Sequence, residues 1–452
     1  MIQMQLSAAA HLLAAEHIGA DVTFRGVSTD TRSLQHGNLF VALVGPNFDG
    51  HHFISEAFAK GAVAALVNQR VEAPLPQLAV AHTHQGLGQL AAGWRAQFSL
   101  PVIGVTGSNG KTTVKEMIAA ILAQSGPMLV TQGNFNNDIG VPLTLFQLDG
   151  KHRYAVIEMG ANHLGEIGYL TQLVRPTVAL ITNAGPAHLE GFGSLDGVAH
   201  GKGEIYAGLD DDGIAVINAD DVYAPLWRGL AGSRRCLSFG LSQPADVSAQ
   251  WEAHADGSLI QLVTPAGQLA LRLKLPGKHN VMNALAATAA ALAVEAPLTD
   301  IQHGLEGMRA VAGRLQLRTG YNGVRIIDDS YNANPASLNA GITVLAAQPG
   351  AKWLVLGDMA ELGPDAAQAH HAVGRAAHAA GINRLYCVGE LSREASKSFG
   401  HGAHHFATQA ELVDAIRLAI AGNHADDITL LVKGSHSAEM ERVVAALTAT
   451  EH

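Results

Sequence analysis

The stretch Val102-Ile-Gly-Val-Thr-Gly-Ser-Asn-Gly-Lys-Thr-Thr113 decides how the rest of the chain is interpreted. It begins as an apolar strand, turns through two glycines and continues as a helical run. Glycine lets the backbone curl around an anion, the start of the helix adds partial positive charge, and the lysine adds a full charge. The spacing is that of a shorter phosphate loop, because Val105 stands where the longer Walker form has glycine. The residues predicted to bind a nucleoside triphosphate are Thr106, Gly107, Ser108, Asn109, Gly110, Lys111, Thr112 and Thr113.

Three side chains could hold a magnesium ion beside this loop. The hydroxyl of Thr112 follows the lysine directly and could reach a Mg²⁺ that bridges the phosphates. Glu158 ends the apolar run 154–157 and His188 follows the run 178–182, so both should lie at the edge of the sheet that carries the loop. On spacing alone, Glu158 is equally well explained as a helix cap and His188 as a surface loop residue. Both interpretations stay open.

Apolar runs alternate with helical segments on both sides of the loop, as in a parallel sheet with helices on its two faces. Strands of this central unit are predicted at 102–105, 128–131, 154–157 and 178–182, followed by an antiparallel appendage at 236–275 and a helix at 281–293. A first helix and strands at 22–27, 38–43 and 62–67 precede the unit, and strands at 324–327, 353–356, 385–388 and 429–432 follow it. We therefore predict an α/β protein of three domains. They are a small N-terminal α/β domain (1–98), a central doubly wound phosphate-loop domain (99–312) and a Rossmann-like C-terminal domain (313–452).

Composition narrows the function class. The 452 residues carry a net charge of −10, which disfavours broad attraction to nucleic acid or to an anionic membrane. No apolar stretch is long enough for a membrane span, and the N-terminus lacks the basic start of a signal peptide. Two cysteines without metal-type spacing suggest reduced thiols. We expect a cytoplasmic monomer that binds small molecules, with solvated histidines at 51–52, 370–371 and 404–405.

A resemblance to a known family goes further than spacing does. The motifs that carry it are Thr106-Gly-Ser-Asn-Gly-Lys-Thr-Thr113, Glu158-Met-Gly, Asn183-Ala-Gly-Pro-Ala-His-Leu-Glu190, Gly277-Lys-His-Asn-Val-Met-Asn-Ala284 and Gly313-Arg-Leu-Gln316. In this order they resemble the Mur ligases, ATP-dependent enzymes that build peptidoglycan precursors. Three further motifs resemble the branch that adds D-alanyl-D-alanine to UDP-N-acetylmuramoyl-tripeptide. They are Asn134-Phe-Asn-Asn-Asp-Ile-Gly-Val-Pro142, Asp328-Asp-Ser-Tyr-Asn-Ala-Asn-Pro335 and Gly357-Asp-Met-Ala-Glu-Leu-Gly363.

The resemblance implies roles for residues that spacing leaves unassigned. It places Thr112 and Glu158 on one Mg²⁺, and His188 on a second one together with a carbamylated Lys202. Without the family, Lys202 is an ordinary exposed helix lysine. Carbamylation would turn a cation into the anion that a second Mg²⁺ needs. Lys111, Lys202, His188 and Arg314 would be the catalytic residues, with Arg314 reaching the γ-phosphate from the third domain. The adenine and ribose side would be formed by His279, Asn280, Asn283 and Asp329.

The same resemblance assigns the two other substrates. Ser28, Thr29, Asp30 and Phe40 in the first domain would bind the uridine diphosphate group, and Asn136, Asn137, Tyr331, Asn332 and Asn334 would lie near the acyl-transfer site. The alternative for both groups is plain turn chemistry, because Asp, Asn, Ser and Pro favour tight turns. The stretch Lys433-Gly-Ser-His436 departs from the family, which has arginine at the last position.

The implied reaction is phosphorylation of the tripeptide carboxylate by ATP, followed by attack of the D-alanyl-D-alanine amine on the acyl phosphate. Because the phosphate loop and Arg314 belong to different domains, the site should assemble only when these domains close, and an open arrangement is expected before the ligands bind. Two alternatives remain: another carboxylate-amine ligase, such as a diamino-acid-adding enzyme or a folylpolyglutamate synthase, and a non-catalytic nucleotide switch.

Overall fold

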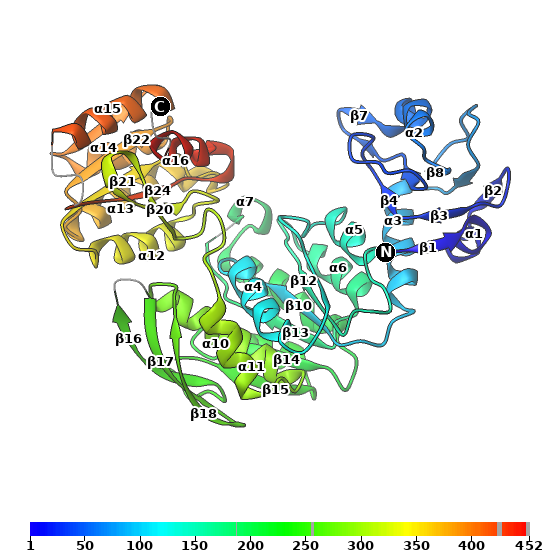
Figure 1. Cartoon of the computed structure of the whole chain (residues 1–452), viewed down its shortest axis with the longest axis horizontal. Helices are drawn as coiled ribbons and strands as arrows, with labels where there is room; N and C mark the ends of the chain where they lie inside the picture. Colours follow the sequence, from blue (N-terminus) through cyan, green and yellow to red (C-terminus); the bar gives the residue numbers. More distant parts are fainter. Residues whose placement is uncertain (187, 255–256, 423–426, 449–452) are drawn as a thin grey trace.

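The computed structural model describes residues 1–186, 188–254, 257–422 and 427–448. Three α/β domains follow one another along the chain, and the central domain lies between the other two (Figure 1). The predicted fold class is thereby confirmed. Among the helices of these described segments, none is both long and apolar enough to cross a membrane.

The N-terminal domain is built on a five-stranded sheet whose strand order is β2-β9-β8-β5-β4. All neighbours in this sheet are parallel except β2 and β9. Its strands are β2 (Glu16–Ile18), β4 (Val27–Ser28), β5 (Leu39–Val41), β8 (Ala64–Val67) and β9 (Gln77–Ala79). The surrounding elements are β1 (Gln3–Gln5), α1 (Leu6–Leu13), β3 (Thr23–Arg25), the hairpin β6 (Val44–Gly45) and β7 (Phe48–Asp49), α2 (Ile54–Ala59) and α3 (Thr83–Arg95).

The central domain has a six-stranded parallel sheet with the order β11-β12-β10-β13-β14-β15. Its strands are β10 (Val102–Thr106), β11 (Met128–Val130), β12 (Tyr154–Glu158), β13 (Val178–Ile181), β14 (Ile214–Asn218) and β15 (Arg235–Phe239). The phosphate-loop strand β10 sits between β12 and β13, the strands that end in the predicted metal ligands or lead to them. This is the position where the order of strands reverses and where ligands bind in open α/β sheets.

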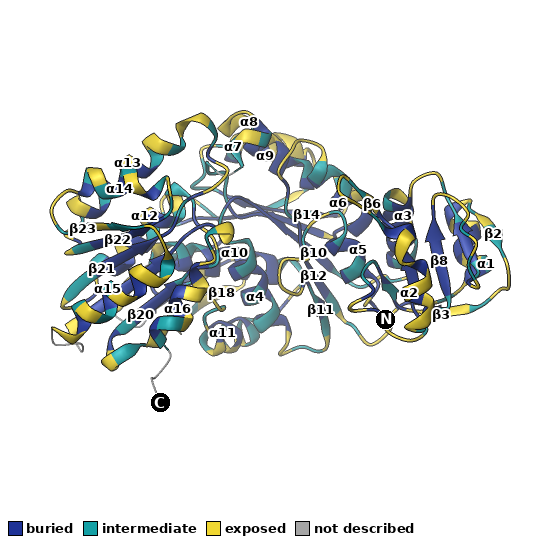
Figure 2. Cartoon of the chain, turned by 90° about the horizontal axis from the view of Figure 1, so that it is seen from above, coloured by how far each residue is buried: buried dark blue, intermediate teal, exposed yellow. Residues whose placement is uncertain are grey.

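Apolar side chains alternate between the two faces of this sheet. Figure 2 shows the buried strands of the sheet with helices on both sides. Val102 and Ile181 pack into one core, whereas Ile103 and Val105 pack into the other. The first core lies under α5 (Gly140–Leu145), α6 (Glu166–Val174), α8 (Leu195–Gly203) and α9 (Ala224–Ala231), with α7 (Leu189–Phe192) beside it. The second lies under α4 (Lys111–Leu122), α10 (Lys278–Ala293) and α11 (Leu298–Gly307).

The antiparallel appendage is smaller than the sequence predicts. Three strands, β16 (Ser248–His254), β17 (Gly257–Thr264) and β18 (Gly267–Leu273), form a separate antiparallel sheet. Residues 235–239, by contrast, pair in parallel with β14 as the edge strand of the central sheet. The prediction failed there because Arg235 and Ser238 interrupt the apolar run, although residues 237–239 are buried.

The C-terminal domain repeats the doubly wound plan with the order β19-β20-β24-β21-β22-β23, in which only β19 is antiparallel. Its strands are β19 (Gln316–Thr319), β20 (Arg325–Asp329), β21 (Ala351–Leu356), β22 (Arg384–Val388), β23 (Ala403–Phe406) and β24 (Ile428–Lys433). The helices α12 (Pro335–Ala346), α13 (Ala366–Ala379) and α14 (Ser392–Phe399) cover one face, and α15 (Gln409–Ala421) and α16 (Met440–Thr448) cover the other.

Candidate active site

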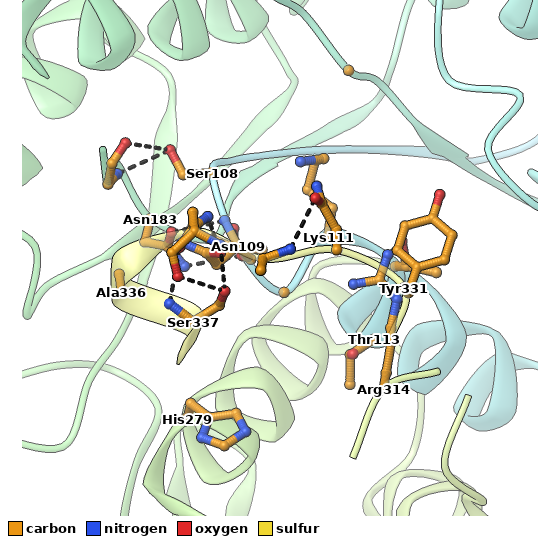
Figure 3. Close-up of a pocket in the computed structure, with 18 of the residues that line it drawn as sticks. Ser108, Asn109, Lys111, Thr113, Asn183, His279, Arg314, Tyr331, Ala336 and Ser337 are labelled. Atoms are coloured by element: carbon orange, nitrogen blue, oxygen red, sulfur yellow. Dashed lines mark hydrogen bonds between the residues drawn. The ribbon is translucent and has the colours of Figure 1, made fainter. Parts of the chain in front are cut away.

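A cavity of about 880 Å³ lies between the central and C-terminal domains. Both sheets turn their carboxyl ends towards it, so residues far apart in the sequence line the same space (Figure 3). The predicted site residues that line it are Ser108, Asn109, Gly110, Lys111, Thr112, Thr113, Asn136, Asn137, Glu158, His188, His279, Asn280, Asn283, Arg314, Asp329, Tyr331, Asn332 and Asn334. Those outside its lining are Ser28, Thr29, Asp30, Phe40, Thr106, Gly107 and Lys202.

The phosphate loop is fastened to the segment that follows β13. The amides of Ser108 and Asn109 donate to the main-chain and side-chain oxygens of Asn183, both at 3.0 Å. Gly107 and Gly110 have φ values of +143° and +82°, which L-residues with a side chain rarely adopt. The amides of Ser108 and Asn109 therefore hold the loop in place and are not available to a ligand. The amides that open onto the cavity are those at the start of α4, where a helix has no acceptors of its own.

Lys111 is a partly buried cation at this helix start. Its Nζ donates to the carbonyl of Gly107 at 2.8 Å (Figure 3). Burial lowers the pKa of the Lys111 amine, and the nearby carboxylate of Glu158 opposes that effect. Thr106 supports the same loop from below, because its fully buried hydroxyl donates to the carbonyl of Met159 at 2.7 Å. Lys111 thus faces the cavity, whereas Thr106 holds the loop.

Arg314, for which the resemblance implies a contact with the γ-phosphate, reaches the phosphate loop from the third domain. Its Nη2 donates to the hydroxyl of Thr112 at 3.0 Å, and its guanidinium lies 4.3 Å from the ring centre of Tyr331. A second bridge joins Asn334 Nδ2 to Asn109 Oδ1 at 2.8 Å. The two domains therefore contact each other directly beside the cavity.

Glu158 is the buried carboxylate of the site, with an exposed fraction of 1%. One oxygen accepts a hydrogen bond from Asn136 Nδ2 at 2.8 Å, and the other, Oε2, is buried without a hydrogen-bond partner among the described residues. A buried carboxylate oxygen of this kind costs free energy unless a cation or a donor meets it. Glu158 therefore fits a Mg²⁺ ligand and not a helix cap, because α6 begins eight residues later.

His188 also faces the cavity, and it meets the C-terminal domain. Its Nδ1 lies 2.5 Å from Oε2 of Glu361, and burial lowers the pKa of the imidazole. A neutral imidazole is the form that ligates metals. The described residues contain no group of three or more His, Cys, Asp or Glu side chains in metal-binding geometry. A Mg²⁺ bound to a nucleotide takes only one or two protein carboxylates, because phosphates and water complete its shell.

Lys202 lies in α8 and is 1% exposed, so it is not the exposed lysine that spacing alone suggests. Its Nζ donates to the carbonyl of Ala161 at 3.1 Å and lies 5.1 Å from the ring centre of Phe192. Ala161 lines the cavity and Lys202 does not, so the Lys202 amine lies directly behind the cavity wall, against the carbonyl of Ala161. Burial lowers the pKa of Lys202 to about 7, with the charge of Lys111 acting in the same direction. A neutral amine is the form that reacts with carbon dioxide.

The residues implied for the adenine side begin helix α10. Asn280 donates from Nδ2 to the carbonyl of Pro276 at 2.8 Å, and Asn283 donates to Asn280 Oδ1 at 3.2 Å. Both amides thus hold the helix start as well as line the cavity. His279 lines the cavity too, and burial lowers its pKa.

The acidic motif of the third domain forms a compact network. Lys433, at the end of β24, donates to Asp329 Oδ2 at 2.5 Å and to the carbonyl of Asn332 at 2.8 Å. Asn334 caps α12 through Oδ1 and contacts the phosphate loop through Nδ2, so its turn role and its site role coexist. The ring of His436 lies 5.5 Å from that of Tyr331. Lys433 and Glu361 are site residues that spacing did not identify, although both stand in motifs at carboxyl ends of predicted strands.

The residues implied for the uridine diphosphate group lie at the other end of the molecule (Figure 1). Ser28 Oγ donates to the carbonyl of Asp30 at 2.9 Å, and the carboxylate of Asp30 pairs with Arg32, which lowers the pKa of Asp30 to about 2. Thr29 lies between them in this turn. Phe40 is different: it is 1% exposed and belongs to the core of the domain. Its ring therefore cannot contact a substrate, which corrects the expectation for this side chain.

The burial of Phe40 predicts that this side chain contributes strongly to the free energy of unfolding. Replacing Phe40 with alanine should cost about 3–5 kcal/mol of unfolding free energy, because it empties a packed core. Urea unfolding of the variant measures this cost. The matched control is Phe58→Ala, since Phe58 is 46% exposed and should cost about 0.5 kcal/mol or less. A Phe40→Ala protein that unfolds like the parent but binds UDP-sugars poorly would contradict the core assignment.

The expectation of solvated histidines is wrong for one member of each of two pairs, whereas His52 and His371 are exposed as expected. His51 and His370 are 7% and 0% exposed. The ring of His51 meets Asp49 and the amide of Asn68, and that of His370 lies between the amide of Met359 and the carbonyl of Ala366. Each ring bonds on both nitrogens, which is what allows a polar ring to be buried. Sequence spacing carries no sign of such local partners.

Known proteins match this chain over nearly its whole length. Three families match it: the Mur ligase family catalytic domain at residues 23–95, the Mur ligase middle domain at 105–291, and the Mur ligase glutamate ligase domain at 313–436. The UDP-N-acetylmuramoyl-tripeptide–D-alanyl-D-alanine ligase of Escherichia coli is 48% identical over 450 residues, which is 99% of each chain. A crystal structure of MurF from Acinetobacter baumannii has a TM-score of 0.94 at 38% identity and covers 99% of each chain. MurF from Thermotoga maritima in complex with ADP has a TM-score of 0.82 at 27% identity, covering 94% of this chain and 97% of that one.

Proposed function

Because the chain belongs to the Mur ligase family, we infer that it is an ATP-dependent ligase that joins D-alanyl-D-alanine to UDP-N-acetylmuramoyl-tripeptide during assembly of the peptidoglycan precursor. The observation that carries this inference is the cavity between the second and third domains, where the helix start of the phosphate loop, two cations and a buried carboxylate meet. Full-length similarity to the E. coli enzyme supports the same substrates.

The reaction proceeds in two steps. An oxygen of the tripeptide carboxylate attacks the γ-phosphorus of ATP, the bond to the β-phosphate oxygen breaks, and ADP leaves. The free amine of D-alanyl-D-alanine then attacks the acyl carbon, phosphate departs, and the nitrogen gives up a proton as the peptide bond forms. No nucleophilic side chain is needed, so the enzyme contributes position and charge.

The charges of the site suit the first step. Lys111 and Arg314 come from different domains and face one cavity, so together they stabilise the negative charge on the phosphoryl group in transfer. In this arrangement Arg314 also donates to Thr112, and a γ-phosphate oxygen would compete for that proton. Domain closure keeps water away from the acyl phosphate, which water would otherwise hydrolyse.

Magnesium supplies charge neutralisation for the phosphates when it is bound. Thr112 and the unpaired oxygen of Glu158 would hold one ion. His188 and a carbamylated Lys202 would help to hold a second, and the buried amine of Lys202 beside Ala161 supports this assignment. The first domain would hold the uridine diphosphate group. We further propose that the chain acts as a cytoplasmic monomer with domain limits at 98/99 and 312/313. These limits are supported by the first strands of the central and C-terminal sheets, which begin at Val102 and Gln316.

A phosphate-release assay tests the function directly. With ATP and UDP-N-acetylmuramoyl-tripeptide present, we expect steady phosphate release only after D-alanyl-D-alanine is added, because the acyl phosphate needs the amine to turn over. Free D-alanine serves as the control for the dipeptide, and diaminopimelate and glutamate serve as controls for the related ligases. Release that ignores the dipeptide would point to a nucleotide switch. Release with glutamate or diaminopimelate instead would point to another carboxylate-amine ligase.

A further inference from the structure

One buried charge plays no part in the reaction described above. Lys115 lies in α4, one helical turn after Lys111, and is 1% exposed. Its Nζ donates to the carbonyl of Thr131 at 2.6 Å and lies 2.9 Å from Oε1 of Glu116. A lysine is seldom fully buried, since desolvation of its ammonium group costs free energy unless partners compensate. This position is therefore one where a specific contact outweighs that cost.

The acceptor of this contact leads to the metal-site carboxylate. Thr131 follows β11 and is fully buried. Its hydroxyl oxygen accepts the main-chain N–H of Glu158 at 3.0 Å, and its own N–H donates to the carbonyl of Val156 at 3.1 Å. Thr131 thus bonds to strand β12 at two backbone positions, Val156 and Glu158. The carboxylate itself is oriented by Asn136 at 2.8 Å.

Together these bonds join two elements that each supply one cation ligand. Helix α4 carries Thr112 in its first turn, and β12 ends in Glu158. The link runs from Lys115 on the helix, through the carbonyl and hydroxyl of Thr131, to the backbone of Glu158. Groups that hold metal ligands in place strongly affect metal affinity, because a ligand must be fixed before the ion arrives.

We propose that Lys115 and Thr131 are positioning residues that fix the carboxylate of Glu158 relative to the hydroxyl of Thr112, so that both oxygens meet the same divalent cation. The proposal rests on the proposed function, since it assumes a cation bound with the nucleotide at this cavity. A purely structural role for the pair would lower the melting temperature and leave the affinity of folded protein for the cation unchanged.

The test measures Mn²⁺ binding to the full-length protein in the presence of ADP, by electron paramagnetic resonance of free Mn²⁺. Thr131→Val removes the hydroxyl that holds Glu158 but keeps the volume, and Lys115→Met removes the ammonium group. Each should raise the Kd for Mn²⁺ roughly tenfold or more. Thr131→Ser keeps the hydroxyl and should stay within about twofold of the parent. The matched control is Glu116→Gln, which touches Lys115 but neither Thr131 nor Glu158, and it should also stay within about twofold.

Melting temperatures identify which variants are folded, and only folded variants are compared. A folded Thr131→Val or Lys115→Met protein with the parental Kd overturns the proposal, and so does loss of folding in both, since that outcome shows a purely structural role. If only one of them folds, its Kd decides. Failure of the proposed function looks different, because it shows in the phosphate-release assay of the parent, which would then not respond to D-alanyl-D-alanine, and leaves the comparison of Kd values intact.

Discussion

Replacing Lys111 with alanine should lower ATP-dependent phosphate release by roughly a thousandfold or more, with both acceptor substrates present. The lysine is the only full charge in the quoted phosphate loop, and its Nζ lies at the helix start where phosphates bind. Its loss removes the cation that stabilises the negative charge on the phosphoryl group during transfer. The measurement is steady-state phosphate release, supported by a single-turnover experiment that isolates the chemical step.

The control for this variant replaces a different lysine of the same domain. Lys151 is exposed and lies outside the cavity, so Lys151→Ala should retain parental activity. Both variants should melt close to the parent, since Lys111 bonds only to the loop carbonyl of Gly107 among the described residues. Near-normal turnover of Lys111→Ala would remove the phosphate-loop assignment, and the proposed reaction would fall with it.

The fold was predictable where strands are buried on both faces. Residues 102–106 and 178–181 contribute to cores on both sides of the sheet, so their sequence is continuously apolar and marks them as central parallel strands. Edge strands carry a weaker signal. The strand 403–406 reads Ala-His-His-Phe, and its exposed side leaves a pattern that resembles a loop. In residues 235–239, polar Arg235 and Ser238 interrupt the apolar run, so this strand was assigned to the predicted appendage.

The site was predictable where a single motif contains both the charged side chain and the strand end that places it at the edge of the sheet. Lys111 and Glu158 follow directly from a strand that ends at the sheet edge, because parallel strands bring their carboxyl ends together. Contacts between domains were not predictable from the spacing of residues alone. The approach of Glu361 to His188, and of Asn334 to Asn109, depends on how two folded units pack, and neither sequence segment encodes the position of the other. The burial of Lys202 likewise arises from Phe192 and Ala161, which no spacing rule connects to it.

Removing Lys202 should also cause a large loss of activity, but the group that restores activity should be an anion, whereas position 111 requires a cation. If the lysine is carbamylated, its working form is an anion, and Lys202→Ala should lose activity by roughly a hundredfold or more through loss of a metal ligand. The substitution leaves a small buried space beside Ala161, where a short carboxylic acid such as acetate can stand in for the carbamate. Partial recovery of phosphate release on adding acetate is the expected result.

Two further variants separate a carbamate from an ordinary cation. Lys202→Arg keeps positive charge but cannot form a carbamate under these conditions, so it should stay inactive. Lys111→Ala should gain nothing from acetate, because that position requires a cation. The pKa of Lys202, lowered to about 7 by burial, makes the neutral amine available near neutral pH, and parental activity should therefore rise with added bicarbonate as the pH increases through 7. Full activity in Lys202→Ala or Lys202→Arg would reject the modification, since either one would show that an anion at this position is not needed.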